Sequence, residues 1–226
     1  VVYAVPKDWG TTGFIVNTKS TTENPVTWKD FFALTQGPLS GKVTVHDYQL
    51  TTIGSAAVSL GYDFNTIDPK ELAEIEKLLV ATKPHLFGVT SDYQPAMRNG
   101  DAVMAMCWTN DASQLNRDIP EMSYRLGKDG GEIWVDHYAV IKGAPNREAA
   151  YAFLDYILTP DINEKEIEAH GTPSTDARVI KLLPEKITKN PILYPAAESL
   201  SKLEFGAAET LTNPDRAELM ARFKSA

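Results

Sequence analysis

The sequence is poor in cysteine and in long apolar runs. Its one cysteine, Cys107, excludes an internal disulfide. No apolar run approaches the roughly 18 residues that suggest a membrane-spanning helix. The 30 acidic residues outnumber the 22 basic ones, which gives a net charge of −8. This charge argues against a nucleic-acid-binding protein, which needs a basic surface to displace counterions, and is compatible with a cationic ligand.

The motifs of common enzyme classes are missing as well. The sequence contains no GxSxG elbow, no P-loop, no GxGxxG and no HExxH. The four histidines, His46, His85, His137 and His170, are scattered without metal-ligand spacing. We therefore expect no catalysis, no metal and no cofactor, and interpret the histidines as structural.

Strand-like and helix-like segments alternate along the 226 residues. This alternation predicts an α/β fold with a mainly parallel sheet. The clearest helix is expected over residues 68–84, where Asp68 can cap the first turn and Pro69 takes the first position. Thr27 is the expected cap of a helix over residues 27–35. Further strands are expected over residues 12–18, 41–47, 85–91, 101–111 and 130–140, and further helices over 50–60, 147–161, 163–170, 175–183 and 215–224.

Tryptophans stand next to polar residues in several of these segments. Trp9 opens the turn-like WGTTG, and Asp111 follows three residues after Trp108. Within the strand GGEIWVDHYAV, Trp134 and Asp136 are two residues apart and therefore share a face. Taken alone, each tryptophan is more simply interpreted as a core residue. An aromatic face beside a carboxylate, however, suits an ammonium ligand, because the ring attracts the cation and the carboxylate accepts charge-assisted hydrogen bonds.

Several segments together resemble the periplasmic spermidine/putrescine-binding proteins of ABC importers. They are YAVPKDWGTTGFIVNT, SLGYDFNTIDPKEL, GDAVMAMCWTND, GGEIWVDHYAVIKGAPNREAAYAFLDYILTPDI and GTPSTDARVIKLLP. The resemblance implies a two-lobed periplasmic binding protein fold (type II) that closes around a small amine, such as putrescine or spermidine, and delivers it to a membrane permease. It also implies a removed signal peptide and a periplasmic location, or lipid anchoring outside a Gram-positive cell.

The resemblance gives roles to individual residues. Trp134 matches the aromatic side chain that packs on the ligand's methylene chain, and Asp136 matches the carboxylate that holds an amino group. Trp108 matches an aromatic from the other lobe, and Asp111 a carboxylate of putrescine-type members. Trp9 is included among the expected ligand-binding residues.

One departure from the family concerns the ligand. Where the family usually offers a glutamate, the nearest residues here are Thr51 and, a turn earlier, Tyr48. We include both in the expected site. Loss of this charge favours a short diamine or, as an alternative ligand, an ω-amino acid such as 4-aminobutyrate, with Arg98, Arg117 and Arg125 as candidate carboxylate partners. A further alternative is the effector-binding domain of a transcription regulator, which has a similar two-lobed architecture.

A second departure concerns the start of the chain. It opens on VVYAVPKDWG without a methionine, so we expect a processed chain or a fragment. Family members carry roughly a further hundred residues, about the size of one lobe, before YAVP. The expected first lobe is therefore a remnant, residues 1–11 and 133–183, and the second lobe comprises residues 12–132 and 184–226. The remnant would expose apolar surface and favour self-association or binding of a missing segment.

Overall fold

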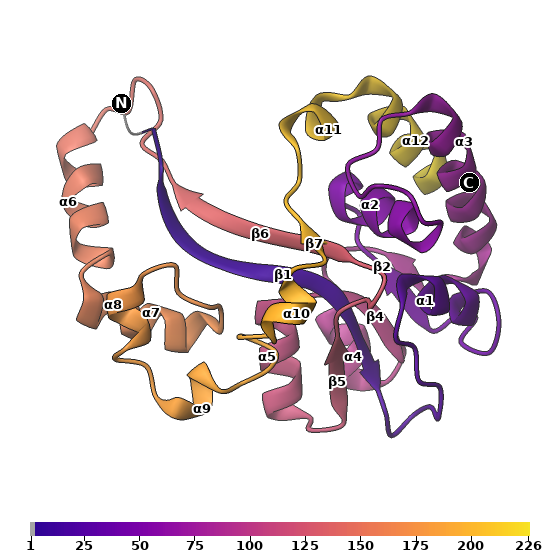
Figure 1. Cartoon of the computed structure of the whole chain (residues 1–226), viewed down its shortest axis with the longest axis horizontal. Helices are drawn as coiled ribbons and strands as arrows, with labels where there is room; N and C mark the ends of the chain where they lie inside the picture. The colour runs from indigo at the N-terminus through magenta and orange to yellow at the C-terminus, as the bar shows by residue number, and fades with distance from the viewer. Residues whose placement is uncertain (1–2) are drawn as a thin grey trace.

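A long strand, β1 (Val5–Asn17), runs through the middle of the molecule and joins its two ends (Figure 1). The computed structural model describes residues 3–226, so residues 1–2 of the expected first-lobe segment lie outside the described residues. Strand β1 pairs antiparallel with β4 (Met104–Trp108), β5 (Met122–Arg125) and β6 (Gly131–Tyr138). It is therefore the strand with the most pairing partners in the sheet.

The sheet has the order β3-β2-β4-β1-β6-β7, with β5 also paired to β1. Strand β2 (Val43–Val45) is parallel to both β3 (Gly88–Val89) and β4, and β6 is parallel to β7 (Leu203–Glu204). The prediction of a mainly parallel sheet is wrong, because β1 runs antiparallel to each of its three neighbours. The α/β class itself is confirmed.

Most of the expected helices form, and local capping explains two of them. Asp68 accepts hydrogen bonds from the first turn of α3, and Thr27 caps α1 as predicted. Helix α5 was not predicted, because the polar residues that follow Trp108 resemble a turn. The helices are α1 (Trp28–Thr35), α2 (Gln49–Ser59), α3 (Pro69–Thr82), α4 (Gln94–Asn99), α5 (Thr109–Asp118), α6 (Arg147–Ile157), α7 (Pro160–His170), α8 (Ala177–Ile180), α9 (Glu185–Thr188), α10 (Ala197–Leu200), α11 (Ala208–Thr212) and α12 (Pro214–Ser225). None of the helices in residues 3–226 combines the length and the apolar composition needed to cross a membrane.

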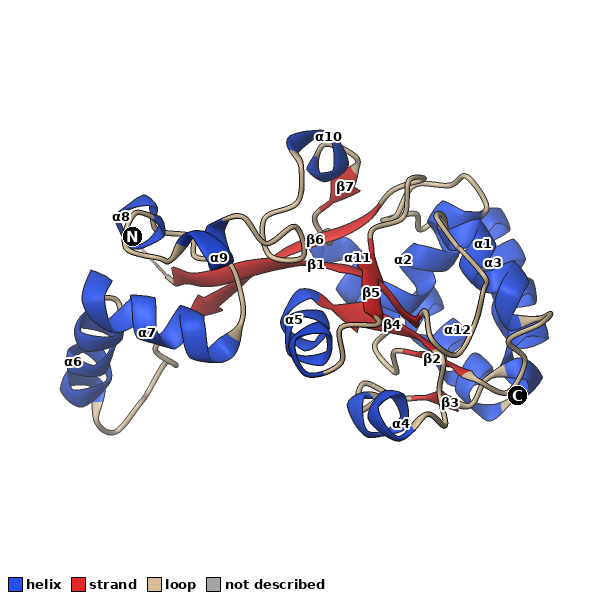
Figure 2. Ribbon diagram, turned by 90° about the horizontal axis from the view of Figure 1, so that it is seen from below, coloured by secondary structure: helices blue, strands red, loops and turns tan. Residues whose placement is uncertain are grey.

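Alternate residues of β1 enter two separate cores, one on each face of the sheet. Phe14 and Val16 belong to the larger core, with buried side chains of α1, α2, α3 and α12. Ile15 belongs to the other, with residues of α4 and α5 and with the buried thiol of Cys107. The two helical layers can be followed in Figure 2. A third, small cluster of Ile167, Val179 and Leu183 joins α7 to α8 far from both cores.

Helix α6 exposes much of its apolar surface. Tyr151, Phe153 and Tyr156 are 46%, 53% and 59% exposed, and Ile141 in the preceding loop is 76% exposed. In Figure 1, α6 lies at the end of the molecule opposite to the main cores. An exposed apolar surface of this kind agrees with the expectation for residues 133–183. Self-association through it stays a prediction.

We predict that Thr27→Ala lowers the free energy of unfolding by about 1 kcal/mol, because it removes an N-cap hydrogen bond. The Thr27 hydroxyl accepts from the Asp30 amide (3.0 Å), and Asp30 Oδ2 accepts from the Thr27 amide (3.0 Å). Urea unfolding of this variant and of Thr22→Ala, an exposed neighbour, tests the cap. Equal stability of the two variants would contradict it.

Candidate functional site

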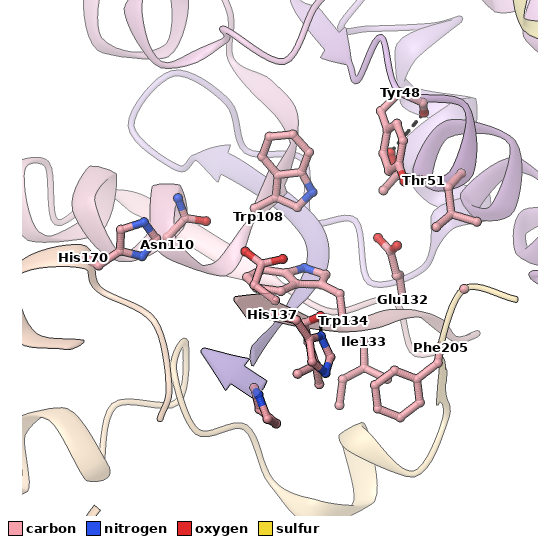
Figure 3. A pocket seen from close by; sticks show the side chains of 15 residues that line it. Tyr48, Thr51, Trp108, Asn110, Glu132, Ile133, Trp134, His137, His170 and Phe205 are labelled. Atoms are coloured by element: carbon pink, nitrogen blue, oxygen red, sulfur yellow. Dashed lines mark hydrogen bonds between the residues drawn. The ribbon is translucent and has the colours of Figure 1, made fainter. Parts of the chain in front are cut away.

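A cavity of ≈ 870 Å³ lies beside β6 and is lined by residues along most of that strand (Figure 3). Its walls come from the start of α2, the end of β4, the end of α7 and the loop after β7. The lining residues are Pro6, Tyr48, Leu50, Thr51, Trp108, Asn110, Glu132, Ile133, Trp134, Val135, Asp136, His137, His170, Phe205 and Gly206. Five of the seven residues expected from the sequence are therefore brought together: Tyr48, Thr51, Trp108, Trp134 and Asp136.

The indole of Trp134 lies across β1 because the residue opposite it is a glycine. Gly10 is the register partner of Trp134, and a Cβ at position 10 would lie 2.4 Å from Trp134 Cζ2. The buried Nε1 of Trp134 has no hydrogen-bond partner among the described residues. The motif WGTTG thus has a structural role: its first glycine makes room for the ring.

Trp108 is held by a stack of rings behind it. Its ring centroid lies 4.1 Å from that of His46, which in turn stacks on Tyr93 at 5.4 Å. The Trp108 amide donates to the Tyr93 hydroxyl (3.0 Å). Burial lowers the pKa of His46 to about 3, so this imidazole is neutral and packs as an aromatic ring. The interpretation of His46 as a structural histidine agrees with this environment.

The start of α2 contributes one exposed and one buried side chain. Tyr48 is 41% exposed, whereas Thr51 is 1% exposed. The Thr51 hydroxyl donates to the Tyr48 carbonyl (3.2 Å) and lies 3.2 Å from His46 Nδ1. Thr51 thus shapes the wall of the cavity, and its hydroxyl already has partners within the protein.

Glu132 is a cavity residue that the sequence analysis missed. It is 3% exposed, and the Thr12 hydroxyl opposite it on β1 donates to its Oε2 (2.5 Å). Desolvation by burial raises the pKa of Glu132 to about 7, and the Thr12 hydrogen bond opposes this rise. The alternation of strand residues could have found it, because Glu132, Trp134 and Asp136 are two apart and share one face.

Asp136 lies further along the same strand, at an exposed position. Partial desolvation and the nearby Asp8 carboxylate raise the pKa of Asp136, while Lys7, His170 and His137 act in the opposite direction. The strand face therefore carries one deeply buried carboxylate and one accessible carboxylate, with the Trp134 indole between them.

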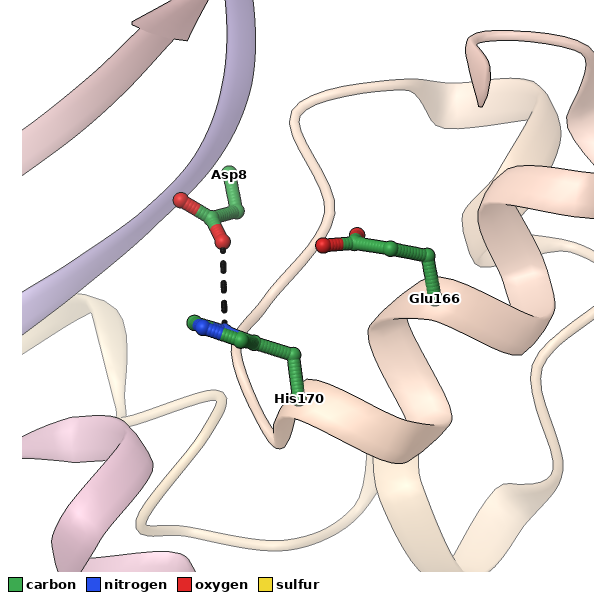
Figure 4. Close-up of side chains that lie close together, drawn as sticks. All are labelled: Asp8, Glu166 and His170. Atoms are coloured by element: carbon green, nitrogen blue, oxygen red, sulfur yellow. Dashed lines mark ion pairs between the residues drawn. The ribbon is translucent and has the colours of Figure 1, made fainter. Parts of the chain in front are cut away.

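A cluster of two carboxylates and a histidine lies near Asp136. Asp8, Glu166 and His170 each offer a ligand atom, and these atoms lie within 4.8 Å of one another (Figure 4). Lys7 Nζ, however, is 3.2 Å from Asp8 Oδ2 and 3.7 Å from Glu166 Oε1. Because the protein supplies its own cation here, we assign no metal to this cluster.

Two of the expected site residues lie elsewhere. Asp111, in the first turn of α5, lines a neighbouring cavity and accepts hydrogen bonds from Gln94 Nε2 (2.9 Å) and Asn110 Nδ2 (3.0 Å). Trp9 is adjacent to Gly10 on β1 and so points away from Trp134. Its Nε1 donates to the Ser174 carbonyl (3.2 Å), and it does not line the cavity.

None of the three candidate arginines reaches the cavity beside β6. Arg98 pairs with Asp118 (3.0 Å), Arg117 lies 3.3 Å from the same carboxylate, and Arg125 donates to the Pro25 carbonyl (2.8 Å). The described residues that line the cavity include no lysine or arginine. Its charged groups are acidic, apart from the two histidines.

Known proteins share this fold and sequence pattern. A family model for bacterial extracellular solute-binding proteins matches residues 1–195. The chain belongs to this family. The resemblance noted in its motifs is thereby confirmed.

Curated relatives and solved structures agree with the family. The spermidine/putrescine-binding periplasmic proteins of Escherichia coli and Salmonella typhimurium are each 29% identical, over 92% and 90% of this chain. The chain spans 61% and 58% of their lengths. The structure of a spermidine/putrescine ABC transporter protein from Listeria monocytogenes matches with a TM-score of 0.89 and 25% identity, over 98% of this chain and 69% of that one. These matches confirm the periplasmic binding protein fold.

We predict that Gly10→Ala displaces the Trp134 ring, because the added Cβ and the indole cannot occupy the same space. The fluorescence of Trp134 is obtained by subtracting the spectrum of a Trp134→Phe variant, once in the unmodified protein and once in the Gly10→Ala protein. The two difference spectra should not be the same. Gly88→Ala is the control, since a Cβ there meets only Thr90 at 3.7 Å. An unchanged Trp134 contribution in Gly10→Ala would contradict this packing.

The pKa of Glu132 also predicts how stability depends on pH. Between 4.5, its ordinary value, and about 7, the folded protein holds a proton on Glu132 that the unfolded chain releases. The free energy of unfolding should therefore fall by about 3 kcal/mol as the pH rises through this range. Urea unfolding at both limits, compared with Glu132→Gln, isolates this contribution; identical pH dependence in the two proteins would contradict it.

Proposed function

We propose that this protein is the non-enzymatic substrate-binding component of an ABC importer and binds a small amine, such as putrescine or spermidine, in the cavity beside β6. The observation that carries the proposal is the face of β6, where Trp134 lies between two carboxylates and no lysine or arginine among the described residues lines the cavity. The relatives in Escherichia coli and Salmonella typhimurium, which are named spermidine/putrescine-binding periplasmic proteins, support the same ligand class.

The chemistry of the cavity fits an alkylammonium ion. The Trp134 and Trp108 rings offer apolar faces for methylene groups and attract a cation by about 0.5–2 kcal/mol each, depending on desolvation. The Asp136 carboxylate can accept a charge-assisted hydrogen bond, which fixes the position of the amine. A hydrated metal ion would gain little from the aromatic walls.

The proposed lobes are those expected from the sequence. The first comprises residues 1–11 and 133–183, and the second comprises residues 12–132 and 184–226. Strands β1 and β6 cross between them, and the separate cluster of Ile167, Val179 and Leu183 supports a core of its own on the first-lobe side. A ligand held by Trp108 from one side and Asp136 from the other would favour closure of the lobes. The closed form would deliver the amine to the membrane permease from the periplasm or, if lipid-anchored, from outside a Gram-positive cell.

The alternative ligand, 4-aminobutyrate, has less support. Its carboxylate requires a cationic or strongly donating partner. Of the described residues that line the cavity, only His137 and His170 are basic. The second alternative, a transcription regulator, gains nothing from the family match, which is to extracellular solute-binding proteins.

A comparison of two aspartates tests the proposal. Asp136→Asn should weaken putrescine binding by about 2–5 kcal/mol, roughly 30- to 4,000-fold, because the ammonium loses its charged partner in the closed cleft. Asp111→Asn is the matched control, since Asp111 lies in the neighbouring cavity. Tryptophan fluorescence of the full-length protein, titrated with putrescine, spermidine and 4-aminobutyrate, measures both. Equal losses in the two variants, or equal affinity for putrescine and neutral 1,4-butanediol, would contradict an ammonium-binding role.

A further inference from the structure

We propose that Glu132 binds a second ammonium group and thereby selects ligands with two amines joined by a methylene chain. This inference rests on the proposed function and goes beyond it, because it names the residue that sets the ligand class. Of the two carboxylates on this strand, only Asp136 is expected from the sequence to bind the ligand. The structure shows that both line the same cavity.

The spacing of the two carboxylates along β6 suits a ligand that lies parallel to the strand. Glu132, Trp134 and Asp136 are two residues apart on one strand face, so the outer two Cα atoms are about 13–14 Å apart with the indole midway. Figure 3 shows Glu132 pointing into the cavity toward Thr51 and Tyr48, beyond the Trp134 ring. An extended ligand lying along the strand would place its methylene groups on Trp134 and one amine toward each carboxylate.

Glu132 lacks a cationic partner among residues 3–226. It is 3% exposed, and no ion pair among the described residues includes it. The Thr12 hydroxyl is the one hydrogen-bond donor to it that the described residues provide. A buried carboxylate without a counter-charge is costly, so an ammonium ion that enters the cavity gains a strong partner there.

The titratable groups around Glu132 cannot supply the missing charge. Tyr48 faces it from the start of α2 and Tyr124 from β5, and burial raises the pKa of both hydroxyls, which stay neutral. Glu204 is its register partner on β7 and is itself acidic. None of these groups can carry a positive charge, so the ligand would have to supply it.

The burial of Glu132 predicts a distinctive pH dependence of binding. Because the free carboxyl has a pKa of about 7, it is largely protonated below that pH and must lose its proton to bind an ammonium ion. Affinity for a diamine should therefore rise as the pH increases from about 6 to 8. A ligand carboxylate at this position would need the protonated form and would show the opposite trend.

The test compares putrescine with butylamine, which has the same carbon chain and one amine. In calorimetric titrations of the full-length protein, Glu132→Gln should weaken putrescine binding roughly 30-fold or more and leave butylamine binding nearly unchanged. Glu121→Gln, an exposed carboxylate away from the cavity, is the matched control and should alter neither. The rise in putrescine affinity between pH 6 and 8 should be clearly larger in the unmodified protein than in Glu132→Gln.

The outcomes separate this inference from the function on which it rests. If Glu132→Gln leaves putrescine affinity intact while Asp136→Asn reduces it, the amine-binding function stands and the role of Glu132 is refuted. Equal losses for putrescine and butylamine would show that Glu132 does not select for a second amine. Affinity of the unmodified protein that does not change with pH would refute the inference without any variant. Absence of amine binding altogether would refute both.

Discussion

The pairing of β1 with β6 is the constraint on which the cavity depends. Gly10 lies opposite Trp134, and Thr12 lies opposite Glu132. The first pair lets the indole lie flat across the sheet, and the second fixes the buried carboxylate through a hydrogen bond. A register shift of one residue would turn both side chains to the other face. The same pairing joins the main cores to the α6–α7 end of the molecule, so the site lies where the two parts meet.

The carboxylates around β6 differ in how their charge is compensated. Asp8 is fully buried, but Lys7 is 3.2 Å away and the Thr172 hydroxyl donates to it (2.8 Å). Glu132 is almost as buried and has one hydroxyl as a donor, with no ammonium or guanidinium group in the described chain to pair with. The protein thus supplies a cation, Lys7, to the buried carboxylate of Asp8. In the cavity, the proposed ligand would supply it.

Local features of the fold could be predicted from the sequence, and long-range ones could not. The caps at Thr27 and Asp68 depend on neighbours in the chain, so both predictions are confirmed. The antiparallel course of β1 depends on partners about a hundred residues away, so the prediction of a mainly parallel sheet failed. Among the residues that line the cavity, Trp134 and Asp136 could be singled out from the sequence because their spacing is local. Glu132 was missed although the same alternation includes it. Because Thr51 replaces the glutamate usual in the family, the sequence left 4-aminobutyrate open as an alternative ligand. Glu132 brings a carboxylate into the same cavity from another element.

The most direct measurement is a crystal structure of the full-length protein with putrescine. In that structure the diamine should lie along β6, with its methylene groups on the Trp134 ring and its two nitrogens directed toward Glu132 and Asp136. Hydrogen-bond distances of about 2.7–2.9 Å from an ammonium nitrogen to each carboxylate would support it. A diamine bound away from β6, or one whose nitrogens leave either carboxylate without a partner, would contradict it.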